Sequence, residues 1–365
     1  GFFSALVTGA LLGLLGLLTL RPLVGLLGST ETIAPYAMDY ARYILLGSPW
    51  LVASLVVNNQ IRFQGNAFFS MVGIASGALL NVALDPLFIF TLGLGVAGAA
   101  LATSLSQLVS FGLLLAGTHH GGTIRIRFRQ FTPKLAVFKE IFRGGVPSLL
   151  RQGLASLATV ALNFSAGMFG DTAVAAMSIV TRVVFFAVSE VIGFGQDFQP
   201  ICGFNYGARR FDRVREAFWF SVRLSFFVLL GASVLGMALA PQIVDLFLKG
   251  YPEVTAVGAL SLRLQCVLMP LTGFLILSNM MLQTMGMARE ASLVAASRQG
   301  LFFLPLVLLL PIPLGLLGVQ ISQPLSDLCS LALTIPLTFR VLNNLKREEE
   351  RQTPQGAAAQ THVPV

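Results

Sequence analysis

Ten long apolar runs, with polar breaks between them, limit what this chain can fold into. The runs cover residues 3–27, 38–64, 67–90, 95–117, 145–169, 172–200, 214–248, 255–285, 290–313 and 317–342. An α-helix needs roughly 20 residues to cross the hydrocarbon core of a bilayer, and each run is long enough. Only 11% of the residues are charged, against roughly 25% in soluble domains. The sequence therefore predicts an all-α polytopic membrane protein.

The basic residues fall on one side of the predicted membrane. If alternate loops share the side of the C-terminus, sixteen Lys and Arg residues lie on that side and only Lys249 lies in the opposite loops. Cytoplasmic loops carry such an excess of positive charge. We therefore predict a multi-pass protein of the cell (inner) membrane with a cytoplasmic C-terminus. The same excess explains the net charge of +8 without a nucleic-acid partner.

The second part of the chain repeats features of the first. Three residue types recur 221 positions later: Arg42 at Arg263, Pro49 at Pro270, and Asn58 at Asn279. This interval contains six runs, an even number, so the two copies would cross the membrane in the same direction, as parallel repeats in transporters do.

The repeat predicts two six-helix lobes, with the first two helices of lobe one missing from this sequence. Residues 1–117 would form the incomplete N-terminal lobe with four helices, and 118–144 a basic cytoplasmic loop between the lobes. Residues 145–342 would form the C-terminal lobe with six helices, and 343–365 a polar, disordered tail. The expected partners are the lipid bilayer and small-molecule substrates, and the protein is expected to be monomeric. A chain without two helices could also be a non-functional fragment.

Several stretches resemble one transporter family. They are 81–86 (NVALDP), 95–103 (GVAGAALAT), 144–152 (GGVPSLLRQ), 170–179 (GDTAVAAMSI) and 195–208 (GQDFQPICGFNYGA). Together with the repeat, they make residues 1–345 similar to the multidrug and toxic compound extrusion (MATE) family. The resemblance implies an efflux transporter with alternating access between two lobes. It implies export of amphipathic or cationic xenobiotics by antiport, with H⁺ or Na⁺ as the coupling ion and no other cofactor.

Two positions depart from the pattern of similar sequences. Asp197 stands where they usually have a glycine. Some relatives couple transport through a carboxylate on the first helix of the second lobe, where this chain has Arg151 and Gln152. Others use an aspartate on the first helix of the first lobe, which would precede this sequence. The resemblance therefore assigns no coupling residue here.

Two intramembrane acids are the candidates for ion coupling. Ionisable side chains inside a membrane usually face protein or a wet cavity and mark ion pathways. Glu190 lies about 6 Å from the middle of its predicted helix, at 1.5 Å per residue, and Asp327 lies near the middle of the last one. Either carboxylate could hold a coupling proton or cation. The alternative for Glu190 is a structural ion pair with Arg182.

Polar side chains on the predicted helices are candidates for lining a substrate cavity: Gln152, Asn163, Arg182, Asn58 and Asn279. Gln152 and Asn163 are eleven residues apart, which brings them to one face of an α-helix within about 20°. Hydrogen bonding between helices is the alternative role. The equivalent positions of Asn58 and Asn279 in the repeat favour that structural role.

A flippase for lipid-linked oligosaccharides, which has a similar fold, is the alternative function. Five predicted membrane arginines would suit the diphosphate of such a lipid: Arg151, Arg182, Arg223, Arg263 and Arg298. Arginines facing the cavity would favour this alternative, whereas an apolar and acidic cavity would favour drug export.

An enzyme or a metal site is not expected. The sequence shows no nucleophile–base or paired-acid constellation at helical spacing. The three cysteines, Cys202, Cys266 and Cys329, are far apart, and the three histidines match no metal-ligand spacing.

Overall fold

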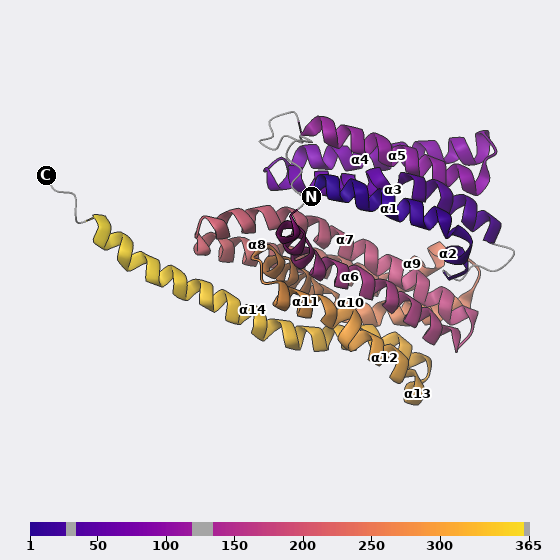
Figure 1. Cartoon of the computed structure of the whole chain (residues 1–365). Coiled ribbons are helices and arrows are strands. Elements are labelled where there is room, and N and C mark those ends of the chain that lie inside the picture. Colours follow the sequence, from indigo (N-terminus) through magenta and orange to yellow (C-terminus); the bar gives the residue numbers. More distant parts are fainter. Residues whose placement is uncertain (27–33, 119–133, 361–365) are drawn as a thin grey trace. The chain divides into compact units, whose positions relative to one another are not determined.

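The computed structural model describes residues 1–26, 34–118 and 134–360, nearly all of which are helical (Figure 1). They form two compact units, Gly1–Leu135 and Ala136–Val365. Eight helices within the described residues are long and apolar enough to cross a membrane. The prediction of an all-α polytopic membrane protein is confirmed.

The described part of unit 1 consists of five α-helices and one π-helical segment. They are α1 (Phe2–Leu18), α2 (Leu20–Leu26), α3 (Ala34–Phe63), α4 (Ala67–Pro86), η1 (Leu87–Thr91) and α5 (Gly95–Gly117). α3 packs against both α1 and α5, and α4 packs against α5.

The contact between α1 and α3 depends on glycines and on a proline. Pro49 has no N–H to donate to the carbonyl group four residues earlier, which is that of Leu45. The Ser48 hydroxyl lies 2.7 Å from the carbonyl oxygen of Leu45 and 2.7 Å from that of Gly9 on α1. A Cβ atom on Gly13 would lie 2.5 Å from Ser48 Oγ. The two backbones can therefore approach closely only because α1 has glycine at these positions.

Unit 2 is built around α10. Its elements are α6 (Leu135–Gly167), α7 (Asp171–Gly207), α8 (Phe211–Ala238), α9 (Ala240–Phe247), α10 (Pro252–Thr284), α11 (Ala288–Ala296), η3 (Ser297–Phe303), α12 (Leu304–Leu309), α13 (Pro311–Leu314) and α14 (Leu316–Gln360). α10 contacts α7, α8, α9, α11 and α14. It therefore forms the centre of the unit.

Equivalent contacts occur at repeat-related positions of the two units. In unit 1, the Ser70 hydroxyl on α4 donates to Asn58 Oδ1 on α3. In unit 2, Asn279 Nδ2 on α10 donates to the carbonyl oxygen of Ala291 on α11 at 2.6 Å. Both partners of the second contact lie 221 positions after those of the first. The two asparagines thus join corresponding pairs of helices.

A column of small hydroxyl residues lets α14 pack closely within unit 2. Ser322, Ser326, Ser330, Thr334 and Thr338 recur every four residues, and all five are fully buried. Each member lies on the same side of the helix as the next one, one turn away. Small residues allow membrane helices to approach closely without a large apolar side chain between them.

Two predicted runs are divided where proline interrupts the helix. The run 214–248 becomes α8 and α9, because Pro241 fits only the first turn of a new helix. The run 290–313 becomes α11, η3, α12 and α13, with prolines in the first turns of α12 and α13. The π-helical segment η3 carries Arg298, which lines a cavity described below.

Two further predicted runs do not meet the criteria for a membrane span. α1 has only 17 residues. α6 has 33 residues but is not among the eight apolar helices, because it carries several polar side chains within its apolar sequence. At the other end of the chain, α14 continues to Gln360, where a disordered tail is expected from residue 343. An ion pair between Lys346 and Glu350, one helical turn apart, favours this continuation.

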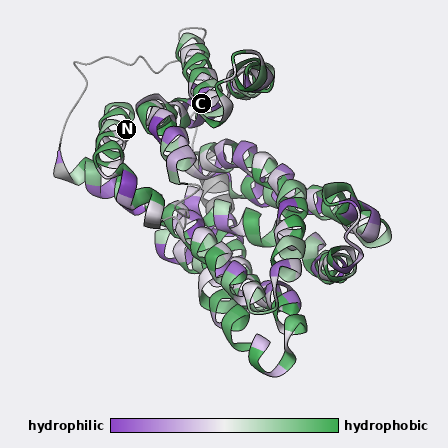
Figure 2. Cartoon of the chain, turned by 90° about the vertical axis from the view of Figure 1, so that its right-hand side faces the viewer, coloured by the Kyte–Doolittle hydropathy of each residue, from purple (hydrophilic) through white to green (hydrophobic). Residues whose placement is uncertain are grey.

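The surfaces of the helices are largely apolar. Figure 2 shows hydrophobic residues over most of the helical length. Large side chains such as Leu18 on α1, Phe90 in η1 and Phe186 on α7 are more than two-thirds exposed. Exposed apolar surface of this extent indicates that the helices face a lipid bilayer.

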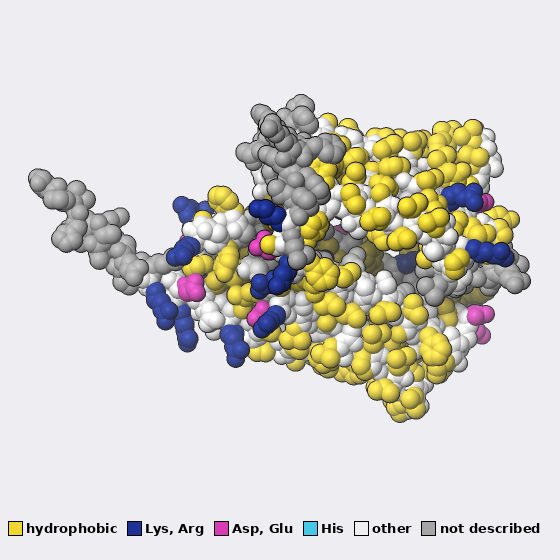
Figure 3. All heavy atoms as spheres, in the orientation of Figure 1, with side chains coloured by type: hydrophobic (Ala, Val, Ile, Leu, Met, Phe, Trp, Pro, Cys, Tyr) yellow, Lys and Arg dark blue, Asp and Glu magenta, His cyan; other side chains and the backbone are white. Residues whose placement is uncertain are grey.

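The basic segments of unit 2 meet at one end. A core cluster joins the C-terminal parts of α7 and α10 to the first part of α8 and to residues 341–345 of α14. Arg215 on α8 pairs with Glu349 on α14 at 2.8 Å. Lys249 follows α9, whose Val244 belongs to a separate cluster with the start of α10. Figure 3 shows Lys and Arg side chains gathered around the outer part of α14.

We predict that Gly13→Ala lowers the thermal unfolding midpoint of the purified protein. The added Cβ would lie 2.5 Å from Ser48 Oγ and 2.6 Å from the Leu45 carbonyl oxygen, and such overpacking costs about 1–3 kcal/mol. Gly112→Ala on α5 is the control, because an added Cβ meets no atom within 4 Å there. Equal midpoints for the two variants would contradict the proposed tight contact.

Candidate functional site

The candidate site is a two-part cavity inside unit 2. One part, the Arg151 compartment, has a volume of about 170 Å³ and lies between α6, α7, α10, α11 and η3. The other, the Met177 compartment, has a volume of about 180 Å³ and extends to α14. The compartments share five lining residues: Ala155, Phe185, Val188, Arg298 and Gln299. They are therefore two parts of one continuous site.

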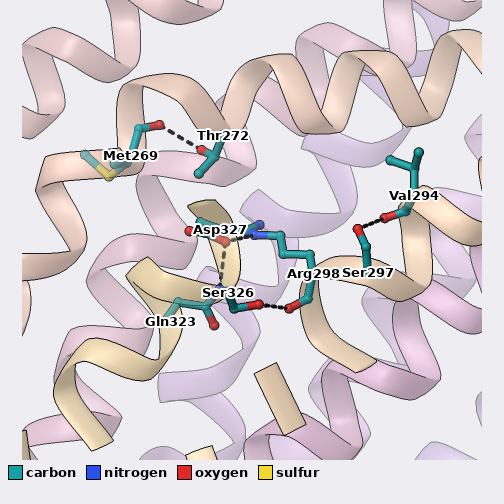
Figure 4. A network of polar contacts seen from close by, with 8 residues as sticks. All are labelled: Met269, Thr272, Val294, Ser297, Arg298, Gln323, Ser326 and Asp327. Atoms are coloured by element: carbon teal, nitrogen blue, oxygen red, sulfur yellow. Dashed lines mark hydrogen bonds and ion pairs between the residues drawn. The ribbon is translucent and has the colours of Figure 1, made fainter. Parts of the chain in front are cut away.

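An ion pair forms part of the wall of this cavity. Arg298 Nε lies 2.7 Å from Asp327 Oδ1, and Arg298 Nη2 lies 3.4 Å from Asp327 Oδ2. Gln323 Nε2, one turn earlier on α14, donates to the same Oδ1 at 2.9 Å. The Ser326 hydroxyl donates to the Arg298 carbonyl oxygen at 2.5 Å. Figure 4 shows these contacts, which tie η3 to α14.

The ion pair belongs to unit 2 alone. The positions equivalent to Arg298 and Asp327 in the repeat are Gly77 on α4 and Gln107 on α5. Gly77 packs there against the Ser106 carbonyl oxygen and the Ser110 side chain, and an added Cβ would come within 3.2 Å of them. Where unit 1 has a close contact between helices, unit 2 therefore has a charged pair beside a cavity.

The cavity has a positive charge that no acidic side chain among the described residues neutralises. Two arginines line it, Arg151 and Arg298, and only Arg298 has an acidic partner, Asp327. No hydrogen bond or ion pair forms between the half-buried Arg151 side chain and the rest of the described chain. Gln152 and Gln299 line the same compartment and offer amide groups for hydrogen bonding.

The opposite face of α7 carries a separate row of charges. Val188 and Ile192 line the Arg151 compartment. Glu190 lies between them, about 200° around the helix from Val188 at 100° per residue, and its side chain is exposed. Arg182 and Asp197 are also exposed, eight residues before and seven after Glu190, so they lie on the same face. α7 therefore separates the basic cavity from a charged surface with two acids.

α6 contributes a polar face next to the cavity. Gln152, Ser156, Thr159 and Asn163 are all exposed, and their spacing of four, three and four residues places them on one side of the helix. Gln152 lines the Arg151 compartment and Thr159 the Met177 compartment. A polar face on a membrane helix faces water or protein rather than lipid.

The structure brings only some of the predicted residues together. Gln152 and Asn279 line the Arg151 compartment, and Asp327 lies behind it through Arg298. Glu190 and Arg182 are exposed on α7 and form no ion pair with each other.

The other two predicted residues lie outside this cavity. Asn163 is exposed on the polar face of α6. Asn58 is buried in unit 1. The predicted cavity residues therefore do not form a single site within either unit.

Three further side chains of the Met177 compartment were not among the predicted residues: Gln265, Gln299 and Gln323. Glutamines on predicted membrane helices are unusual polar residues, and this could have marked all three as candidates for lining a cavity. Among the described residues, no three His, Cys, Asp or Glu side chains form a group that could hold a metal ion.

Comparisons with known proteins identify the family. The family model MatE matches residues 1–87 and 147–309. Multidrug export protein MepA of Staphylococcus haemolyticus is 25% identical over 345 residues, which are 94% of this chain and 75% of the relative. MepA of Staphylococcus aureus is 26% identical over 332 residues, which are 89% of this chain and 72% of the relative.

Solved structures show the same fold. A MATE transporter crystallised in a bent conformation superimposes with a TM-score of 0.86 and 26% identity, covering 95% of this chain and 78% of that one. An outward-facing multidrug resistance MATE transporter of the MOP superfamily gives a TM-score of 0.85 and 26% identity, covering 94% and 78%. The chain is a multi-pass membrane transporter. It belongs to the MATE family.

We predict that Asp327→Asn lowers the unfolding midpoint much more than Glu349→Gln does. The Asp327 side chain is 7% exposed, and its replacement by asparagine leaves the charge of Arg298 without its partner. The side chains of Glu349 and Arg215 are each about one-third exposed. Removing one partner of a buried pair costs about 3–5 kcal/mol, and an exposed pair contributes about 0–1 kcal/mol. Thermal unfolding in detergent measures both changes.

The double variant Arg298→Gln/Asp327→Asn is the internal control for that experiment. It removes both charges together, so we expect it to recover most of the loss. A double variant as unstable as Asp327→Asn alone would show that the missing charge balance is not the cause.

Proposed function

We propose that this protein exports amphipathic xenobiotics across the cell membrane by antiport with H⁺ or Na⁺. The observation that carries the proposal is the likeness to multidrug export proteins over 94% of the chain. The polar cavity inside unit 2 supports it, because transporters of this kind bind substrate among their membrane helices. Alternating access between the two units would carry the substrate across.

Glu190 is the proposed coupling residue. Its side chain is exposed on a helix of membrane length and has no ion pair in the described chain. Because a charged side chain does not face lipid, this face of α7 must meet water or protein. Asp327 is less suited to exchange ions, since three hydrogen bonds from Arg298 and Gln323 already occupy its oxygens.

A lipid-linked oligosaccharide flippase is less well supported. Of the five membrane arginines, only Arg151 and Arg298 line the two compartments, and Asp327 neutralises Arg298. One unpaired arginine gives little compensation for the charges of a diphosphate.

We expect Glu190→Gln to abolish gradient-driven efflux, because glutamine keeps the shape of the side chain but cannot carry a proton or hold a cation by charge. The measurement is extrusion of a fluorescent drug from proteoliposomes under an imposed pH or Na⁺ gradient, each applied separately. The gradient that drives efflux in the parent protein identifies the coupling ion.

Glu253→Gln is the matched control for this experiment. Glu253 is an exposed acid in the first turn of α10 and lines neither compartment of the cavity. Its efflux should equal that of the parent protein. Full efflux by Glu190→Gln at equal protein levels would remove Glu190 from the coupling mechanism.

The proposed orientation predicts which ends of unit 2 react from outside the cell. In a variant with the three cysteines replaced by serine, Lys249→Cys should react with a membrane-impermeant maleimide in intact cells. Arg347→Cys on α14 should react only after the membrane is permeabilised. The opposite pattern would place the C-terminus outside.

A further inference from the structure

We propose that the cavity of unit 2 binds an organic anion attached to an aromatic ring system, such as an aryl carboxylate, with Arg151 as its main charge partner. This inference deepens the proposed export function by assigning a substrate class to the same cavity. It rests on that function for the role of the ligand, but the site can be tested without transport.

The charges of the cavity determine which sign of charge a ligand must carry. Arg151 has no partner in the described chain. Arg298 uses Nε and Nη2 to bind Asp327, which leaves Nη1 as a further donor. A carboxylate would compensate the charge of Arg151 through strong, charge-assisted hydrogen bonds. A cationic group would instead meet two guanidinium groups and find the Asp327 carboxylate already occupied.

Amide groups complete the polar part of the site. Gln152 and Gln299 line the Arg151 compartment, and neither side chain hydrogen-bonds within the described chain. Each can donate N–H groups to an anion. The amides add hydrogen-bond donors without charge, so the one uncompensated guanidinium, that of Arg151, suits a singly charged group.

The apolar walls determine the rest of the ligand. Phe185 and Val188 border both compartments, and Leu162, Met177 and Phe303 line the Met177 compartment. A cavity of about 150 Å³ lined by apolar side chains accommodates benzene. The two compartments, about 170 and 180 Å³, therefore provide space for about one ring each. A two-ring compound with an anionic group at one end fits this arrangement.

Equilibrium binding to the purified full chain tests the inference without any gradient. The probes are 1-naphthoate and, as its cationic counterpart, 1-naphthylmethylammonium, titrated by calorimetry. We expect the protein to bind 1-naphthoate more tightly than the cation. Arg151→Gln should weaken naphthoate binding about tenfold or more, since hydrogen bonds to charged groups contribute about this much, and should not weaken binding of the cation.

Arg223→Gln is the matched control, because Arg223 is an exposed membrane arginine on α8 that borders neither compartment. It should bind both probes like the parent protein. The double variant Arg298→Gln/Asp327→Asn keeps the charge balance and should weaken naphthoate binding less than Arg151→Gln. Unchanged naphthoate binding in Arg151→Gln, equal loss in Arg223→Gln, no naphthoate binding, or preference for the cation would each overturn the inference.

The outcomes for binding and export are separable. Naphthoate binding that depends on Arg151, without gradient-driven efflux of any compound, would support the site and contradict the proposed function. Efflux of a cationic drug by a protein that does not bind naphthoate would support the function and contradict the site.

Discussion

The bilayer cannot hydrogen-bond to a buried polar group, and unit 2 depends on how the protein meets this constraint. Pro270 leaves the Cys266 carbonyl without its usual helical donor, and the Ser233 hydroxyl on α8 supplies one. Asn279 meets the Ala291 carbonyl. Such contacts position α10 against its neighbours, and the cavity is the space that this packing leaves between α6, α7, α10 and η3.

Arg298 carries a charge within a membrane helix and lines both compartments of the site. A guanidinium inside a membrane helix requires an anionic or hydrogen-bonding partner. Asp327 on α14 is this partner, and Gln323 donates a hydrogen bond to the same Asp327 oxygen. The pair therefore holds a π-helical segment in place. Segments of this kind are frequent at functional sites, and this one carries two cavity residues, Arg298 and Gln299.

Periodicity and self-similarity in the sequence were sufficient to predict the membrane fold and the paired role of Asn58 and Asn279. They could not predict the Arg298–Asp327 pair, because 29 residues and three helix breaks separate the partners. The helical period alone places Val188 and Glu190 on opposite sides of α7, but the sequence could not show which of these two sides borders a cavity.

The opposite charges of the two proposed sites limit how the proposed antiport can work. A coupling cation at Glu190 and an organic anion at Arg151 would attract rather than repel each other, so they cannot exclude one another by charge. Exchange then requires that ion and substrate favour different conformations, because a ligand shifts an equilibrium only by its differential affinity for the two states. α7 is suited to transmit this preference, since Val188 and Ile192 border the cavity and Glu190 lies on its other face. A small rotation of α7 would alter both sites at once, so in the proposed antiport the position of this one helix would link ion binding to substrate binding.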